Sequence, residues 1–591
     1  MGEVFPHPSF LRKPPTPTIL KEAKEADGHD ERGGTVPGQL LDGIQIAETP
    51  DAEQPIARAS AQVTAFVGRT LRGPINQPLI VRSFADFQQH FGGLWQPSPL
   101  SYAVEHFFEQ GGRQAAIVRV ANGAAPVTLS LRCGRNMLRL EARAPGTREF
   151  LRASIDYDHI EASDQQRFNL VVQRVRSPGS ERIEEQETFR GLSIDPPSPR
   201  FVATALLESN LVRVRGVVPG VRPDRTLMPG TNLPVGYVSS NPDGDDGRPI
   251  TDYDVIGSAT RRSGLFALEG VEDLAFVHIP PLTRTVDVGA SALLVAAKFC
   301  RDHRAILIVD PPSTWDTVTD AVRAMKALSF HSDNAVMFFP RIAATDRLRG
   351  RIETFGNGGA VAGVLSRSGE AVSAALAAYQ EPEPLLRAGA KLAREMNPAD
   401  RWLLAAHGIN MLQAVRSPDR ERPAMRTLAC GASASSDWSY LAQRRFALFA
   451  INAIERGTRW CVFAPADRGV WERATRQICS FLDELRSAGA FAAVPADQAF
   501  VVICDERIND ETDEPRIVNI LVQFAATHAG EYHSFMITHS VRGATVRPVA
   551  VNRLEATLIV SHELEREITI KLNPGEGRLI AQRHVPARLL S

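Results

Sequence analysis

The sequence predicts a multidomain protein of the α/β class with α+β portions, in which an antiparallel β insertion interrupts an α/β core. Its 591 residues exceed what one hydrophobic core supports and predict about three to four domains. Apolar strands alternate with amphipathic helices on both sides of a middle stretch, which instead shows short, alternating, Arg-rich strands. We expect extended arms at both ends of the chain.

The composition is that of a globular protein and argues against two kinds of partner. It is 43% hydrophobic and 23% charged, and 67 Lys and Arg residues against 68 Asp and Glu residues give a net charge of -1. A protein that coats nucleic acid needs surplus cations to displace counterions, so we expect no direct nucleic acid partner. No stretch approaches the ~18 to 20 consecutive apolar residues of a membrane-spanning helix, so we expect no membrane insertion.

The first 35 residues are rich in proline and charge and contain no apolar segment typical of a secretory signal. We therefore expect a disordered or extended tail and folding in a bacterial cytoplasm. The cysteines lie far apart without a C-x-x-C pair, which favours reduced core thiols over disulfides or a zinc site. They are Cys133, Cys300, Cys430, Cys461, Cys479 and Cys504.

The elements before the insertion follow a strand and helix rhythm. A short alternating segment with Leu41, Ile44 and Ile46 could form a strand, and residues 63–68 form a second strand candidate. Two helices should end at paired glycines, at 92–93 and at 111–112, and a strand at 115–120 follows directly.

The insertion comprises alternating strand patterns over 125–217 and a Pro- and Gly-rich loop over 218–249. After it the rhythm returns, with a helix at 290–302, a strand at 304–310, a helix around 317–328 and a strand at 335–340. Strand, helix, strand at these spacings predicts parallel pairing with right-handed crossovers.

The last segment is predicted to contain a long helix at 439–456, a strand at 459–465 and an amphipathic helix at 470–489. Trp471, Ile478, Phe481, Leu482 and Leu485 should line the apolar face of that last helix. Strands are expected at 500–505, 517–525 and 531–540, and residues 555–572 should form two more.

No complete motif for catalysis is present. The run GASAS at 431–435 lacks the second glycine of a nucleophile elbow, and the nearness of His407 and Asp437 in sequence is no evidence of geometry. The run FGNGGAVAG at 355–363 lacks a following Lys-Ser/Thr, so we expect a turn that leads into a strand and not a phosphate loop. We predict no enzyme activity, no catalytic residues and no cofactor.

Metal sites are not expected either. His562 and Glu563 begin a zinc motif whose last position is Arg566. Asp243, Asp245 and Asp246, in the loop NPDGDDG, lack the spacing of a calcium loop and are expected to form a solvated acidic turn.

These features, in this order, resemble the contractile tail sheath family. The matching runs, collinear from about residue 37 to residue 541, are TAFVG at 64–68, RGPINQP at 72–78, SFADFQQHFGG at 83–93, 102–120, 264–280, 300–312, 358–367 and 438–471. The opening at 37–48 only approximates the family pattern, the run at 426–438 is altered, and about fifty residues follow Ser540.

The resemblance implies a structural subunit that polymerises helically around an inner tube in a metastable extended state. Contraction then drives the tube through a target envelope. Implied partners are further copies of the chain, the inner tube protein, the baseplate and tail terminator or cap proteins, in a phage virion tail or an injection particle. The alternatives are a baseplate or other tail structural protein on the same domain, or an α/β hydrolase-like enzyme.

The expected domains follow from the resemblance and the composition. They are an N-terminal tail at 1–36, an arm with a linking strand at 37–62, a sheath core at 63–124 and 251–400, an outer β insertion at 125–250, a C-terminal domain facing the tube at 401–541, and an extension at 542–591.

Two sets of contact residues are implied as well. Arms that add strands to a neighbour's sheet would use Leu41, Ile44, Ile46, Tyr532, Phe535 and Ile537. The candidates for contact with the inner tube are Arg473, Arg476 and Arg486. Arg444 and Arg445 are either ion-pair partners at a subunit contact or the solvated side of a helix, and the resemblance favours the subunit contact.

Overall fold

The computed structural model describes residues 55–57, 62–228, 230–233, 236–327, 330–375, 384–387, 389–416, 422–430, 438–464, 467–491, 499–509, 517–525, 533–549, 558–561, 567–572 and 579–583. The chain divides into two compact units, Met1–Glu53 and Gln54–Ser591. Every described residue belongs to the second unit. None of the helices in this described part combines the length and hydropathy that crossing a membrane requires.

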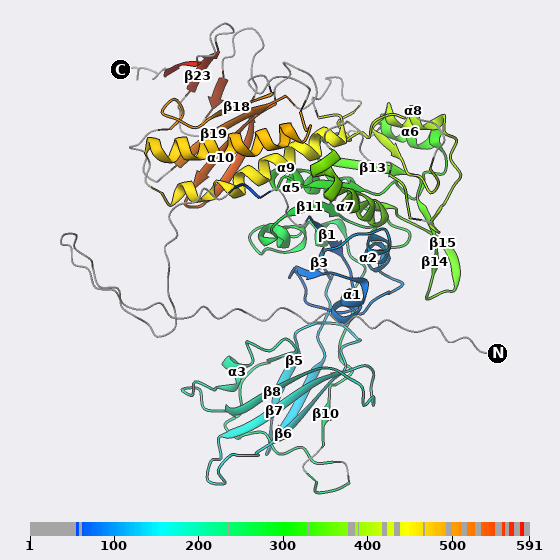
Figure 1. The fold of residues 1–591 in the computed structure, drawn as a ribbon. Helices are drawn as coiled ribbons and strands as arrows, with labels where there is room; N and C mark the ends of the chain where they lie inside the picture. Colours follow the sequence, from blue (N-terminus) through cyan, green and yellow to red (C-terminus); the bar gives the residue numbers. More distant parts are fainter. Residues whose placement is uncertain are drawn as a thin grey trace, which may run out of the picture. The chain divides into compact units, whose positions relative to one another are not determined.

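A seven-stranded sheet forms the centre of the second unit (Figure 1). All neighbouring strands run parallel except β2, which pairs antiparallel with β3. The side chains of the six parallel strands are almost all buried on both faces, as expected for a parallel sheet covered by helices, whereas the edge strand β2 is partly exposed. In spatial order the strands are β17 (Ile409–Met411), β13 (Ala335–Phe339), β12 (Ile306–Val309), β11 (Leu274–His278), β1 (Val63–Gly68), β3 (Ala115–Arg119) and β2 (Leu79–Val81).

Helices cover both faces of this sheet. One apolar cluster joins it to α4 (Asp252–Ile256), the 3₁₀ helix η1 (Gly264–Gly270), α5 (Ala290–Asp302), α6 (Val318–Ala327) and α8 (Asp400–Ala405). A second cluster joins the other face to α1 (Phe84–Phe91), α2 (Pro99–Glu109) and α7 (Gly358–Ala375). The α/β fold class predicted from the sequence is therefore confirmed.

Local signals set the ends of α1. The Ser83 side chain accepts a hydrogen bond from the Asp86 N–H at the start of the helix. At the other end Gly92 has a φ of 88°, the left-handed conformation that glycine adopts without strain. The prediction that the glycine pair at 92–93 ends this helix is therefore confirmed.

The run FGNGGAVAG does not lead into a strand, and the expectation of a turn before a strand was wrong. Strand β15 (Arg351–Phe355) ends there and α7 begins at Gly358. A Cβ on Gly359 would lie 2.1 Å from the Ala103 carbonyl oxygen, and one on Gly363 would lie 2.4 Å from that of Phe107. The glycines thus let α7 pack directly against the backbone of α2.

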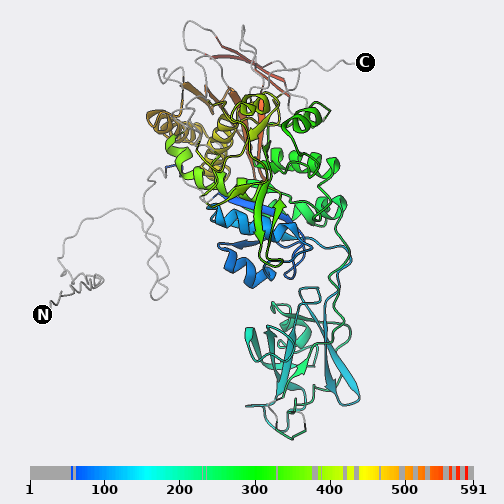
Figure 2. The same ribbon diagram turned by 90° about the vertical axis from the view of Figure 1, so that its right-hand side faces the viewer.

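The insertion consists of two antiparallel sheets with their own apolar cluster. Its strands pair with one another and with no described strand of the central sheet (Figure 2, cyan to teal). One sheet contains β4 (Thr128–Cys133), β5 (Asn136–Ala142) and β9 (Val212–Val214). The other contains β10 (Val238–Ser239), β6 (Leu151–Asp156), β7 (Arg167–Val175) and β8 (Ile183–Ser193), and α3 (Val202–Ala205) packs beside β8 and β9.

The C-terminal body is defined here as α9 (Leu441–Gly457), η3 (Arg459–Val462), α10 (Arg468–Ser487) and an antiparallel sheet. In order, the sheet contains β18 (Phe500–Ile503), β19 (Ile517–Phe524), β20 (His533–Ser540) and β21 (Gly543–Val549). A further sheet contains β22 (Leu558–Ser561), β23 (Glu567–Leu572) and β24 (Leu579–Arg583). Strand β21 pairs with β20, so the sheet continues past the domain end predicted at residue 541.

The strand predicted at 459–465 was wrong, because this segment begins with η3. It follows α9 without a break. Arg459 forms an ion pair at 2.8 Å with Glu455 one turn earlier, and the Cys461 N–H donates to the Thr458 carbonyl. These local contacts keep the chain coiled where its apolar residues had suggested an extended strand.

Candidate functional site

The carboxyl edge of a parallel sheet is where α/β enzymes place their active sites. Here the Asp310 carboxylate accepts a hydrogen bond of 2.7 Å from the Gly358 N–H at the start of α7. His278 is buried, with Nδ1 3.0 Å from the Ile308 carbonyl and Nε2 3.5 Å from Asp310. The carboxylate occupies the helix start where a phosphate loop would hold its anion, so these side chains attach α7 to the sheet.

Helix α9 joins the central sheet to the C-terminal body. Leu441 and Leu448 belong to the apolar cluster of the central sheet. Phe446, Ile451 and Ile454 belong to the cluster of the C-terminal body. A single helix therefore contributes to two hydrophobic cores, and it fixes one relative to the other.

Arg444 and Arg445 contribute to this attachment. They are 6% and 5% exposed. Arg444 donates to the Asn334 side chain at 2.5 Å and forms an ion pair with Asp333 at 3.2 Å, and Arg445 donates to the Leu365 carbonyl at 3.1 Å. Both sequence interpretations of this pair, a subunit contact or a solvated helix side, were wrong, because the pair is buried within the chain.

Ile56 anchors the start of the described chain on the C-terminal body. It is 5% exposed and lies in the same apolar cluster as Phe446. A Cβ on Gly457 would lie 2.7 Å from its side chain, so that glycine leaves room for it. Sequence patterns did not reveal this residue, because its signal was a single large apolar side chain in the run DAEQPIARAS.

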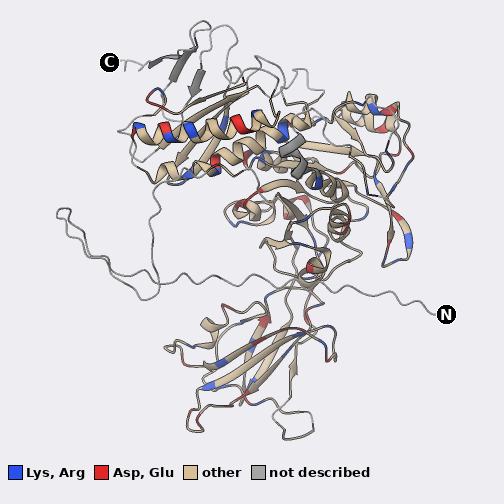
Figure 3. Cartoon of the chain, in the orientation of Figure 1, with Lys and Arg blue, Asp and Glu red and all other residues tan. Residues whose placement is uncertain are grey.

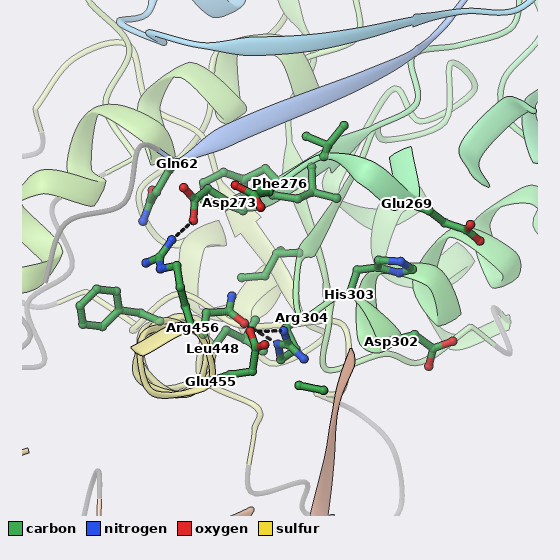
Figure 4. A pocket seen from close by; sticks show the side chains of 18 of the residues that line it. Gln62, Glu269, Asp273, Phe276, Asp302, His303, Arg304, Leu448, Glu455 and Arg456 are labelled. Carbon is green, nitrogen blue, oxygen red and sulfur yellow. Dashed lines mark hydrogen bonds and ion pairs between the residues drawn. The ribbon is translucent and has the colours of Figure 1, made fainter. Parts of the chain in front are cut away.

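A groove of about 520 Å³ lies between α9 and the amino ends of β1, β11 and β12 (Figure 4). Buried Glu455 pairs with Arg304 at 3.2 Å and with Arg459 at 2.8 Å, and Arg456 pairs with Asp273. Burial alone would raise the pKa of Glu455, but the hydrogen bond from Arg459 and the charge of Arg304 outweigh it and lower that pKa. The base of the groove is thus a network of fixed charges.

Strand β20 contains two of the predicted linking residues. Phe535 and Ile537 are buried, and β20 pairs with β19 on one side and β21 on the other. Both edges of β20 are thus hydrogen-bonded within the chain, so in this arrangement the strand cannot pair with a strand of another subunit. The free edges of the described sheet belong to β18 and β21. Leu41, Ile44, Ile46 and Tyr532 lie outside the described residues.

His539 of β20 contacts the end of α9. Its Nε2 lies 2.8 Å from the Thr458 hydroxyl, which itself donates to the Ile454 carbonyl, so the imidazole donates this bond. Burial, together with Arg459 and Arg304, lowers the pKa of His539 to about 4. The neutral imidazole is therefore the form that the C-terminal body accommodates.

The predicted tube-contact arginines all lie on α10, which has both basic and acidic residues along its length (Figure 3). The apolar face expected for this helix is confirmed, with Trp471, Ile478, Phe481, Leu482 and Leu485 buried. Arg473 is partly buried over the Trp460 ring at 3.8 Å, and Arg486 pairs with Asp483 at 2.8 Å. Arg476 is the exposed member of the set.

The aspartates of the insertion loop accept hydrogen bonds from backbone N–H groups, and they do not converge on a common metal position. Asp243 accepts from the Thr128 N–H at 2.8 Å, and Asp246 accepts from that of Thr147 at 2.8 Å. The predicted acidic turn is thus a turn that fastens the loop to the start and the middle of the insertion.

The described fold is similar to that of a sheath tail protein from Listeria innocua, with a TM-score of 0.52 and 13% identity over 83% of this chain and 97% of that chain. Two further structures match with a TM-score of 0.47. They are a sheath tail protein from Desulfitobacterium hafniense (11% identity, 84% of this chain and 100% of that one) and the contracted sheath of an extracellular contractile injection system, PVC (13% identity, 84% and 96%). No protein-family model and no curated protein matches the sequence. At such identities the similarity concerns the fold, and the chain has the fold of a sheath tail protein, as its sequence motifs predicted.

Proposed function

We propose that this chain is a structural subunit of a contractile tail sheath. The observation that carries the proposal is the sheath tail fold, which extends over 83% of this chain and 97% of the Listeria innocua protein. The sequence motifs, which were identified without the structure, support the same conclusion. The subunit polymerises helically around an inner tube in a metastable extended state and contracts to drive the tube through a target envelope.

The architecture suits a rigid subunit that works by changing its packing. A sheath subunit keeps its folded body while its contacts with neighbours change, and the energy is stored when the particle assembles. The sharing of α9 between two hydrophobic cores supports this, because it makes the central sheet and the C-terminal body move together. Partners of such a subunit are further copies of the chain, the inner tube, the baseplate and a terminator or cap, and assembly takes place in a bacterial cytoplasm.

Negative-stain electron microscopy of the expressed full chain tests the proposal. We expect hollow, striated tubes, in the purified protein or after addition of the cognate tube and baseplate. A chain that stays monomeric under all of these conditions would contradict it. A single ring per particle, in place of stacked rings, would indicate the alternative role in a baseplate.

We also propose that the N-terminal arm links neighbouring subunits by adding a strand to a neighbour's sheet through main-chain hydrogen bonds. Leu41, Ile44 and Ile46 form the strand, and β18 or β21 supplies the free edge. Deletion of residues 1–48 should leave a folded protein, since Ile56 and its contacts with the C-terminal body remain. This protein should form no tubes, because the linking strand is gone. Tubes of normal length from the shortened chain would contradict this role.

The tube contact is proposed for α10, through Arg473, Arg476 and Arg486 facing acidic groups. Because Arg476 is exposed whereas Arg473 and Arg486 are partly buried, Arg476 should contribute most. Arg476→Glu should weaken attachment of the sheath to the tube in a co-sedimentation assay. Unchanged attachment, with normal sheath tubes, would remove α10 from the interface.

A further inference from the structure

A β hairpin follows the carboxyl end of β13. It consists of β14 (Ile342–Asp346) and β15, and β15 is the edge strand of a small sheet with β14 and β16 (Lys391–Leu392). The end of β14 next to the turn is fixed by a buried carboxylate, because Asp346, opposite Arg351, is 0% exposed and accepts hydrogen bonds from the Tyr102 hydroxyl at 3.0 Å and from Arg284 at 2.9 Å. The tip of the hairpin is therefore held at a rigid strand end.

The tip combines exposed apolar side chains with surplus positive charge. Leu348 and Ile352 are 53% and 63% exposed. Glu353 is shared by Arg349 and Arg351 of the tip, each at 2.8 to 2.9 Å, and by Arg284. Since Arg284 also pairs with Asp346, the surplus positive charge comes from Arg349 and Arg351, which share the single carboxylate of Glu353. Exposed apolar side chains beside such charge are typical of a protein contact.

The groove beneath α9 has the opposite character at its rim. Glu269 and Glu272 line it, are exposed, and have no ion-pair partner within 4.0 Å among the described residues. Leu448 and Phe449 of α9 and Val271 supply an apolar lining. The charges at the base of the groove are paired with one another, so the exposed Glu269 and Glu272, beside these apolar side chains, are what complements the basic, apolar tip of the hairpin.

The hairpin and the groove lie at opposite edges of the same parallel sheet. The groove is lined by residues that directly precede β11 and β12, at their amino ends. The hairpin follows β13, at its carboxyl end. Since β11, β12 and β13 run parallel, the tip cannot reach the groove of its own chain.

We propose that the tip of the β14–β15 hairpin of one copy binds the groove between α9 and η1 of the next copy. The contact is heterologous, so it repeats from copy to copy and builds a filament or helix and not a closed dimer. It rests on the proposed function, because it assigns one of the subunit contacts of the sheath. Arg349 and Arg351 face Glu269 and Glu272, while Leu348 and Ile352 contact the apolar lining.

Two charge-reversed full-length variants test the contact. Arg349→Glu with Arg351→Glu reverses the tip, and Glu269→Arg with Glu272→Arg reverses the groove. Each variant alone should raise the concentration needed for tube formation by roughly tenfold or more, because like charges then face each other. Mixed in equal amounts they should restore assembly, since each reversed tip then meets a reversed groove and each native tip meets a native groove.

The matched control is Arg323→Glu with Lys326→Glu on the exposed face of α6, which should assemble like the unchanged chain. Thermal unfolding of each variant shows that it is folded. The contact is overturned if the folded variants assemble normally, or if their mixture assembles no better than either variant alone. In both cases, tubes formed by the unchanged chain would still support the sheath function. An unchanged chain that never forms tubes overturns both.

Discussion

The C-terminal body and the β insertion are both built around antiparallel sheets, but they are joined to the central sheet in different ways. The C-terminal body shares α9 with it, through Leu441 and Leu448 on one side and Phe446 on the other. The insertion has an apolar cluster of its own, and polar bonds connect it to the core. These include Arg69 to the carbonyls of residues 246 and 247, Arg72 to Glu184, and Arg143 to Gln77.

The difference teaches which parts should unfold and move together. Apolar burial is proportional to contact area and couples two cores strongly when one helix belongs to both. A few partly exposed hydrogen bonds contribute about 1 kcal/mol each. We therefore expect the central sheet and the C-terminal body to behave as one cooperative unit and the insertion to behave as another.

The largest expected effect comes from matched deletions of a buried ring. Phe446→Ala and Phe168→Ala each remove a fully packed phenylalanine and should each cost about 3 to 5 kcal/mol. Phe446→Ala should increase hydrogen exchange in both the central sheet and the C-terminal body, whereas Phe168→Ala should increase it in the insertion alone. If both variants instead increased hydrogen exchange equally in all three regions, the chain would unfold as one unit.

Acid should loosen the C-terminal body before the insertion. The pKa of His539 is about 4 in the folded chain against 6.5 for the free side chain, so its stabilising contribution is present above pH 6.5 and is lost as the pH falls toward 4. The full loss is on the order of 3 kcal/mol. Denaturant unfolding at several pH values checks this, with His539→Gln as the comparison.

The groups that face His539 are Thr458, Glu455, Arg459 and Arg304. They remain in the His539→Gln variant, so the difference in pH dependence between the two proteins reports on the imidazole. Identical slopes of stability against pH between 6.5 and 4 would contradict the assignment.

A smaller effect is expected at the junction of the insertion. Asp246 accepts two hydrogen bonds from Thr147, each at 2.8 Å. Asp246→Ala should cost about 1.5 kcal/mol, since bonds to a charged acceptor are lost. Hydrogen exchange should rise in residues 143–148 and stay unchanged in α9. A change in α9 would mean that the junction is coupled to the C-terminal body.

The smallest effect is expected at the β4–β5 turn. Gly134 has a φ of 61°, and a Cβ there would meet nothing within 4 Å. Gly134→Ala should therefore cost about 1 kcal/mol through backbone strain alone. Thermal unfolding should show the shift in the transition of the insertion. A shift in the transition of the central sheet would again contradict the separation of the two units.

Local patterns predicted the elements whose signals are local. The helix stop at Gly92, the apolar face of α10 and the parallel strands β12 and β13 were all foreseen from nearby residues. The 3₁₀ helix at the start of segment 459–465 was not foreseen, because it depends on contacts with the preceding helix. Helix α7 was not foreseen either, because its glycines are needed for close contact with α2.

The candidate contact sites divide in the same way. The sequence placed Arg444 and Arg445 on a helix but could not show that both are buried, because Asn334 and Leu365 are far from them in sequence. It also gave no sign that Ile56 anchors the chain, or that Glu269 and Glu272 line a groove with α9.

By itself the sequence determined the rhythm of strands and helices, the position of the insertion and the resemblance to sheath proteins, because periodicity and turn residues act over a few positions. Only the tertiary structure decided that α9 is common to two cores, that β20 is enclosed between β19 and β21, and that hairpin and groove occupy opposite edges of one sheet. These arrangements depend on contacts between residues that are distant along the chain, and burial and charge pairing there are properties of the packed fold.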